Sequence, residues 1–201
     1  MSVYIKKVDK TGKDFMDLKS YNFLENRKIS ILGEITDHTA MDVVFQIEYL
    51  DNLSNDDVFL YINSPGGSVS AGLSIVDAMN RAKSDIVTIC TGIAASMGAV
   101  IVACGKKGKR FITPNAEVMI HQPLGGVVGQ ASDIERKAAY IVKTKLKLTK
   151  ILAEKTGKSV DVITADSDRD YHMSASDAIL YGIADELLNN YTFIRKGQKN
   201  D

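Results

Sequence analysis

Short runs rich in β-branched residues alternate with segments of helical periodicity along most of this 201-residue chain. This alternation favours repeated βα units around a largely parallel sheet, because consecutive parallel strands need a crossover connection that is usually a helix. The runs that we expect to form strands are residues 29–32, 57–63, 86–90, 111–112, 118–120 and 183–188. The predicted fold class is therefore α/β.

Segments with helical spacing are expected to pack one apolar face on that sheet. The expected inward residues are Met41, Val44, Ile47 and Leu50 after a cap at Thr36 and Asp37, and Ala71, Ile75, Ala78 and Met79 in the helix after residue 68. Further helices are expected at residues 17–27, 94–104, 132–156 and 174–181. Residues before about 16 show no clean period and are expected to form an arm or a loop.

The helix expected at residues 132–156 is long for a chain of this size. Ser132 and Glu135 have the spacing of a capping box, and Gly157 supplies a stop. At 1.5 Å per residue the helix would run roughly 37 Å, more than a domain of this size needs to cover its own sheet. We therefore expect part of it to project and pack on another surface.

The charge balance and the apolar pattern argue against several classes of function. The chain has 25 basic and 25 acidic side chains, whereas proteins held to nucleic acid by phosphate contacts normally have a basic excess. Its longest weakly polar run, residues 92–105, is shorter than the roughly 20 residues of a membrane-spanning helix. Cys90 and Cys104 lie in apolar stretches, and the N-terminus has charges where a signal peptide has its apolar core. We expect a cytoplasmic protein with reduced cysteines.

Two turns could carry chemistry, and each also has a plain structural interpretation. Residues 63–68 run from a strand through Gly66 and Gly67 into a helix, which suits either an anion cradle or an ordinary βα turn. Ser96 stands near the start of the apolar helix expected at 94–104, as a nucleophile or as a cap. The segment around Ser96 lacks the G-x-S-x-G pattern, so local sequence leaves both interpretations open.

The titratable residues narrow the choice only in part. Of the three histidines, His121 ends an apolar strand, which is a common place for a general base, while His38 is expected to be exposed. Asp166, Asp168 and Asp170 alternate, and periodicity does not say which of them orients a histidine. No cysteine and histidine spacing suggests zinc and no acidic cluster has the calcium-loop pattern, so no metal is expected.

Three longer motifs carry a resemblance to a known family. They are LYINSPGGS at residues 60–68, GIAASMGA at 92–99 and VMIHQP at 118–123. In this order they closely resemble the proteolytic subunits of the Clp protease, the ClpP family. The resemblance continues through residues 168–170 and 173–175 to 181–182, and covers roughly residues 24–188.

This resemblance implies a crotonase-like α/β fold and a serine endopeptidase that degrades unfolded proteins to short peptides. Carried over by position, Ser96 is the nucleophile, His121 the general base and Asp170 the group that orients His121. Gly67 and Met97 would supply the backbone N–H groups of the oxyanion hole. No metal or organic cofactor is implied.

The resemblance also implies an assembly and partners. Two stacked seven-membered rings would enclose a chamber, interlocked by a handle at about residues 122–157 that includes a glycine-rich strand around Gly125 and Gly126. Asp168 and Arg169 match a ring-to-ring contact, and an AAA+ unfoldase ATPase would supply unfolded polypeptides. The expected division is an N-terminal arm at 1–26, a peptidase domain at 27–193 and a polar tail at 194–201.

The chain departs from the family pattern where the ATPase docks. Arg81 stands where many members have an aromatic residue, although Tyr61, Phe111 and Leu188 keep the apolar character of the docking pocket. An alternative is therefore a divergent paralogue that acts as a structural or regulatory ring subunit and needs a second ClpP paralogue for activity. A remote alternative is a crotonase-type acyl-CoA enzyme, which shares the fold but does not need a Ser–His–Asp set.

Overall fold

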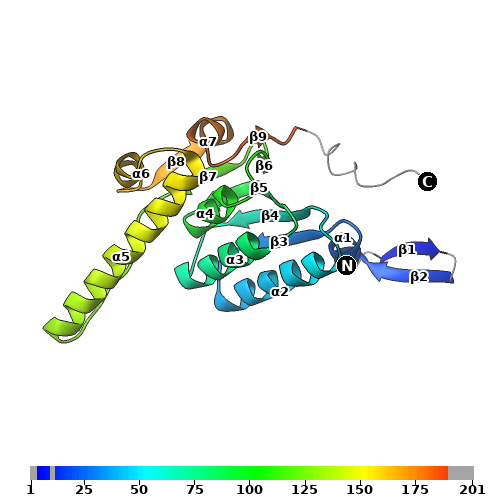
Figure 1. Ribbon diagram of the computed structural model, residues 1–201, viewed down its shortest axis with the longest axis horizontal. Coiled ribbons are helices and arrows are strands. Elements are labelled where there is room, and N and C mark those ends of the chain that lie inside the picture. The colour runs from blue at the N-terminus through cyan, green and yellow to red at the C-terminus, as the bar shows by residue number, and fades with distance from the viewer. Residues whose placement is uncertain (1–3, 10–11, 190–201) are drawn as a thin grey trace.

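The computed structural model describes residues 4–9 and 12–189 (Figure 1). Within this part of the chain a seven-stranded sheet forms the centre of the molecule. Its strands are β3 (Lys28–Leu32), β4 (Val58–Ser64), β5 (Ile86–Ala95), β6 (Arg110–Ile112), β7 (Glu117–Ile120), β8 (Tyr171–Ser174) and β9 (Glu186–Leu187). The helices are α1 (Leu18–Leu24), α2 (Asp37–Leu53), α3 (Val69–Arg81), α4 (Met97–Ala103), α5 (Ala131–Thr156), α6 (Val160–Asp166) and α7 (Ala175–Tyr181).

The sheet is parallel along the order β3-β4-β5-β6-β9, and it branches at the long strand β5. The first part of β5 pairs with β6, whereas residues 93–95 pair with β7. Strand β8 then adds to β7 in the antiparallel direction. The α/β class with a mostly parallel sheet is confirmed, and the branch brings the end of β7 beside the end of β5.

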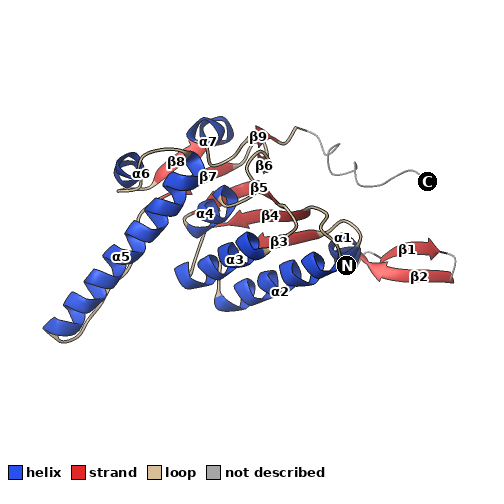
Figure 2. Cartoon of the chain, viewed as in Figure 1, coloured by secondary structure: helices blue, strands red, loops and turns tan. Residues whose placement is uncertain are grey.

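The core lies between this sheet and the helices on one side of it, with α2 and α3 layered together (Figure 2). Every residue of α4 is buried, as expected for a helix that is apolar all round. In α3 the expected inward residues are all buried. In α2 the buried residues are instead Ala40, Val43, Ile47 and Leu50, while Met41 is 54% exposed. The apolar residues of α2 extend around two faces, and the sequence pattern did not separate them.

Helix α5 projects from the body, as its length predicted (Figure 1). Of its 26 residues only Leu148, Thr149 and Leu152, all toward its C-terminal end, are buried. Gly157 ends the helix in the left-handed conformation at φ 81°. The predicted capping box is wrong, because the helix begins at Ala131 with Gln130 as its N-cap and no side-chain cap bond.

Several expected boundaries are also wrong. Where an arm or a loop was expected, residues 4–9 and 12–17 form two antiparallel strands, β1 (Tyr4–Asp9) and β2 (Gly12–Asp17). Strand β5 continues to Ala95, so α4 begins at Met97 and not at residue 94. Residues 93–95 are strand because their backbone pairs with β7.

Other elements were missed or come out shorter than expected. Helix α6 and strand β8 were not predicted, α1 ends at Leu24, and the last strand is only Glu186–Leu187. The segment around Gly125 and Gly126 belongs to no strand. The expected tail at 194–201 lies outside the described residues. Among the helices of the described ranges, none combines the length and hydropathy that crossing a bilayer requires.

Candidate active site

Ser96 occupies the sharp turn between β5 and α4. Its backbone has φ 55° and ψ −120°, a conformation that costs a non-glycine residue free energy and that persists only where surrounding structure holds it. The Ser96 N–H donates to the carbonyl of Met119 on β7 at 2.8 Å. A serine on a strained strand-to-helix turn is the geometry of a nucleophile elbow, because the turn presents the hydroxyl away from the backbone.

Glycines supply the close packing that this turn needs. A Cβ added to Gly66 would lie 2.7 Å from the Ser96 Cβ and 2.8 Å from the Ala95 carbonyl oxygen. A Cβ added to Gly98 would lie 3.1 Å from the Ser64 carbonyl oxygen. In a G-x-S-x-G elbow, one glycine on each side of the serine allows close packing around it. Here Gly98 is the second of these glycines, and Gly66, from another loop, allows the close packing that the first would allow. The local sequence does not reveal this contact.

His121 and Asp170 complete a chain of hydrogen bonds that starts at Ser96. His121 directly follows β7, and its Nε2 lies 3.0 Å from the Ser96 Oγ. Its Nδ1 lies 3.1 Å from the Asp170 Oδ1, in the loop between α6 and β8. The His121 side chain is 16% exposed and that of Asp170 63% exposed. Three residues that are far apart in sequence therefore meet at the C-terminal ends of β5 and β7.

The other two alternating aspartates have different partners. Asp166 accepts a hydrogen bond from the Tyr181 hydroxyl at 2.7 Å. Asp168 is contacted by the side chain of Gln122. Asp170 alone of the three lies against a histidine, so the geometry distinguishes what periodicity left open.

The contacts of His121 determine which of its ring nitrogens donates a hydrogen bond and which accepts one. An ionised carboxylate only accepts hydrogen bonds, so the Nδ1–H of His121 donates to Asp170. The remaining nitrogen, Nε2, is then an acceptor for the Ser96 hydroxyl. The geometry suits transfer of the hydroxyl proton to His121 as the oxygen attacks a carbonyl carbon.

The expected oxyanion donors are the backbone N–H groups of Gly67, in the turn before α3, and of Met97, the first residue of α4. The Gly66 carbonyl accepts from the N–H of Ile35 at 2.8 Å, and the trans peptide therefore turns the Gly67 N–H the opposite way. Met97 begins α4, where N–H groups have no partner within the helix. Within the described residues neither N–H has an acceptor. A Cβ on Gly66 would lie 3.2 Å from the Met97 nitrogen, so the two loops are adjacent.

The cysteines are not alternative nucleophiles. Burial raises the pKa of Cys90 to about 12 and that of Cys104 to about 11. Both thiols are therefore protonated at neutral pH, and the thiolate is the reactive form. Over the described ranges no three His, Cys, Asp or Glu side chains gather to hold a metal ion.

The residues expected at the docking pocket meet in a second apolar cluster on the sheet. Phe111 and Leu188 are buried there with Val87 and Ile89, and Tyr61 packs against them. Asp168 and Arg169 are exposed in the loop before Asp170, with the Arg169 Nε 4.0 Å from an Asp168 carboxylate oxygen.

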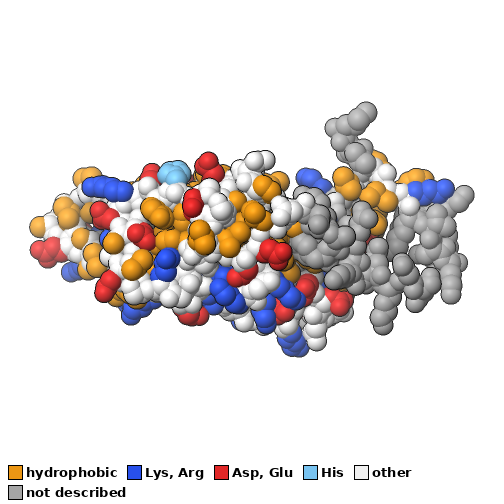
Figure 3. All heavy atoms as spheres, turned by 90° about the horizontal axis from the view of Figure 1, so that it is seen from above, with side chains coloured by type: hydrophobic (Ala, Val, Ile, Leu, Met, Phe, Trp, Pro, Cys, Tyr) orange, Lys and Arg blue, Asp and Glu red, His pale blue; other side chains and the backbone are white. Residues whose placement is uncertain are grey.

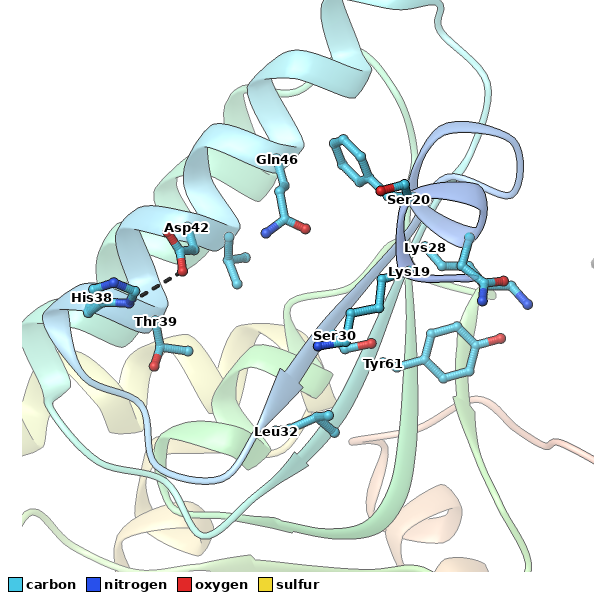
Figure 4. A pocket seen from close by; sticks show the side chains of 13 residues that line it. Lys19, Ser20, Lys28, Ser30, Leu32, His38, Thr39, Asp42, Gln46 and Tyr61 are labelled. Atoms are coloured by element: carbon cyan, nitrogen blue, oxygen red, sulfur yellow. Dashed lines mark ion pairs between the residues drawn. The ribbon is translucent and has the colours of Figure 1, made fainter. Parts of the chain in front are cut away.

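A pocket of about 950 Å³ lies between α1, β3 and α2, away from Ser96 (Figure 4). Its lining combines polar and apolar side chains, with Lys28 and Tyr61 on the sheet and the contact of His38 with Asp42 on α2. His38 is 88% exposed, as expected. No member of the Ser96 site lines this pocket.

Asn63 is a structural contributor that the sequence did not single out. Its Oδ1 accepts from the Ile93 N–H at 3.2 Å, at the point where the register between β4 and β5 shifts. A Cβ on Gly92, which has φ 75°, would lie 2.8 Å from the same oxygen. Asn63 thus supports the irregular end of β5 that leads into Ser96. The sequence feature that could have pointed to Asn63 is its position in the motif at residues 60–68, directly before Ser64.

Comparison with known families gives an independent result. A family model for Clp protease matches residues 11–191. The match contains the whole site and extends beyond residues 24–188, where the motif resemblance was found. A match across most of the length, on a fold that assembles the three motifs at one place, shows that the chain belongs to the Clp protease family and is a proteolytic subunit of the ClpP type.

Proposed function

We propose that this subunit is a serine endopeptidase with Ser96 as nucleophile, His121 as general base and Asp170 as the orienting carboxylate. The observation that carries the proposal is the continuous contact from the Ser96 Oγ through both nitrogens of His121 to Asp170, at 3.0 and 3.1 Å. The strained backbone of Ser96 adds support, because such strain concentrates at functional sites.

The mechanism follows from these contacts. As the Ser96 Oγ attacks the carbonyl carbon of a peptide bond, its proton passes to the His121 Nε2, and Asp170 stabilises the imidazolium. The carbonyl oxygen becomes an oxyanion that receives hydrogen bonds from the Gly67 and Met97 N–H groups. His121 then gives the proton to the leaving amine, and the C–N bond breaks to leave an acyl-serine. Water attacks the ester by the reverse proton path and releases the carboxylic acid.

Family membership implies ring assembly and partnership with a Clp ATPase in general terms. We propose here the specific form of two stacked seven-membered rings, in which residues 122–157 form the handle and Asp168 and Arg169 make contact between rings. The surface supports assembly, since α5 exposes Ile134, Tyr140, Val142 and Leu146. We further propose a cytoplasmic location and an AAA+ unfoldase that docks on the Tyr61, Phe111 and Leu188 cluster and delivers unfolded polypeptides.

A ring subunit that needs a paralogue for activity is the second candidate, and Arg81 is the observation that favours it. Its guanidinium pairs with Glu48 at 3.0 Å, with the side chain 67% exposed, so the surface there is charged. Peptidase assays of the purified chain, alone and mixed with a second subunit, separate the two candidates. The acyl-CoA alternative has no use for the Ser96–His121–Asp170 contacts and is not favoured.

The decisive test is Ser96→Ala. We expect this variant to lose labelling by a fluorophosphonate and to lose roughly 10⁶-fold in peptide turnover. The matched control is Ser70→Ala, which alters an exposed serine in the first turn of α3 and should behave as the unmodified chain. Normal labelling and turnover by Ser96→Ala would contradict the proposal.

A further inference from the structure

Gln122, the residue after His121, attaches the loop that carries Asp170. Its backbone N–H donates to the Ser167 carbonyl at 2.7 Å. Its side-chain Nε2 donates to the Asp168 carbonyl at 3.0 Å. Two consecutive residues thus contact the same loop, His121 at the carboxylate of Asp170 and Gln122 at the backbone just before it.

Lys145 of α5 extends this contact. Its Nζ donates to the Gln122 Oε1 at 2.8 Å. The chemistry fixes the orientation of the Gln122 amide, because an ammonium only donates and a carbonyl oxygen only accepts. The oxygen of Gln122 therefore faces Lys145 and its NH₂ faces Asp168, and a reversed amide would lose both bonds.

Lys145 lies where α5 leaves the body. The buried residues of α5 begin at Leu148, less than one turn further along the helix. Lys145 itself is half-buried, whereas its neighbours Leu146 and Lys147 are exposed. The bond to Gln122 therefore links the base of the projecting helix to the site.

The loop needs such an attachment. Within the described residues the Asp170 carboxylate contacts only His121 and is 63% exposed, so no other side chain fixes its position. On its C-terminal side the loop is held by the pairing of Tyr171 with Ile120. On its N-terminal side the side chain of Gln122 reaches past Ser167 to Asp168, two residues before Asp170.

We propose that Gln122 and Lys145 are positioning residues for the proposed reaction, which hold the 167–170 loop so that Asp170 reaches the Nδ1 of His121. This role rests on the proposed serine-peptidase function, but it assigns the positioning to contacts within one chain. Displacement of reacting groups by about 1 Å can cost about 100-fold in rate, so loss of these bonds is expected to lower kcat. Substrate does not touch either residue in this role, so KM stays within about twofold.

The test compares Gln122→Ala, Gln122→Glu, Lys145→Met and the Gln122→Ala/Lys145→Met double variant in the full chain. Gln122→Glu keeps the shape and still accepts from Lys145 but loses the N–H to Asp168. We expect Gln122→Ala and Gln122→Glu to lower kcat and fluorophosphonate labelling by up to about 100-fold. Lys145→Met lowers them less, and the double variant resembles Gln122→Ala because both act through one contact.

Two controls separate positioning from a general effect on the helix. Lys145→Arg retains a cationic donor and should restore most of the activity lost in Lys145→Met. Lys147→Met removes an exposed lysine of the same helix and should leave kcat unchanged. Native mass and circular dichroism of every variant should match those of the unmodified chain.

Normal kcat in both Gln122 variants would overturn the positioning role, as would an equal loss in Lys147→Met. A loss in the double variant equal to the product of the single losses would also overturn it, because the residues would then act independently. Ser96→Ala distinguishes failure of the positioning role from failure of the proposed reaction. If it is inactive while the Gln122 variants are normal, only the positioning fails, and if it is active the proposed reaction itself fails.

Discussion

At the scale of single residues, the most consequential charge outside the active site is buried. Arg110 is 1% exposed, and its Nε donates to an Asp185 carboxylate oxygen at 2.8 Å. The same guanidinium also donates to the carbonyls of Ala103 and Lys155. Arg110 thereby joins the ends of α4 and α5 to the turn before β9, and an unpaired charge here would be costly.

The lowered pKa of Asp185 predicts that the contact with Arg110 makes the stability of the folded protein depend on pH. Burial alone raises the pKa, but hydrogen bonds and charge from Arg110, with the Gly108 N–H, outweigh it and lower the pKa from 3.8 to about 2. A lowered pKa in the folded state stabilises the protein above the unfolded pKa, and this stability is lost as pH falls from about 4 to about 2. The loss corresponds to about 2 kcal/mol of unfolding free energy.

Asp185→Asn tests this dependence by urea unfolding at fixed protomer concentration. The variant should be less stable than the unmodified chain by about 3 kcal/mol at pH 7, because Arg110 loses its counter-charge. The difference should narrow as pH falls from 4 to 2. Asp161→Asn, at an exposed position on α6, is the control and should show no such narrowing. A difference for Asp185→Asn that stays constant over this range would contradict the prediction.

At the scale of elements, the site depends on a strand that ends later than its sequence suggests. Residues 94–104 are apolar except for Ser96, and an apolar run does not distinguish a buried strand from a buried helix. Pairing of residues 93–95 with β7 decides in favour of strand. That pairing moves Ser96 from an expected first helical turn to the strained position between β5 and α4.

The sequence predicted the parallel strands at the centre of the sheet, the projecting helix and the position of His121 at a strand end, because each depends on local periodicity. It did not by itself select Asp170, whose role depends on a loop brought back by α6 and β8, and only the family resemblance named it. It also missed the β1–β2 pair, since pairing between two strands without an alternating apolar pattern leaves no periodic signal. The contacts between elements that are distant in sequence could not be predicted from local periodicity.

The contact between Gly66 and Ser96 can be tested by comparing Gly66→Ala with Gly33→Ala. Both glycines have a left-handed backbone, but only Gly66 is closely packed. Gly66 has φ 96° and would place a Cβ against Ser96, whereas Gly33 has φ 82° and no atom within 4 Å of an added Cβ. Gly33→Ala should cost about 1 kcal/mol of stability from its backbone conformation alone and leave kcat/KM unchanged. Gly66→Ala should cost more and lower kcat/KM about 100-fold, because Ser96 must move.

Both variants are compared by urea unfolding and by hydrolysis of a short peptide. The difference between them removes the shared cost of the left-handed conformation and leaves the steric effect on the turn. Equal activity in Gly66→Ala and Gly33→Ala would show that the close packing on Ser96 is not required.

At the scale of the whole molecule, large apolar side chains are exposed both on the projecting helix α5 and on α2, which covers the sheet. Helix α2 exposes Phe45 and Tyr49, and α5 exposes Tyr140 and Val142. Hydrophobic side chains also gather in the middle of the face shown in Figure 3, between charges of both signs. Since the chain has equal numbers of acidic and basic residues, copies carry no net repulsion that would oppose their packing.

The proposed role of α5 in assembly gives the last prediction. Val142 is 65% exposed, lies N-terminal to the buried part of α5, and makes no ion pair or hydrogen bond through its side chain. Val142→Asp should therefore leave the folded subunit intact, as judged by circular dichroism, but introduce an unpaired charge at a buried contact between copies. Native mass should shift from the proposed fourteen-subunit particles to smaller species, and peptidase activity should fall with it. Val162→Asp, the same change at a 42% exposed position on α6, is the matched control and should keep the full mass.

Full-size particles from Val142→Asp would exclude this part of α5 from the interface. A buried aspartate without a partner costs several kcal/mol per copy, and a symmetric assembly repeats that cost in every subunit.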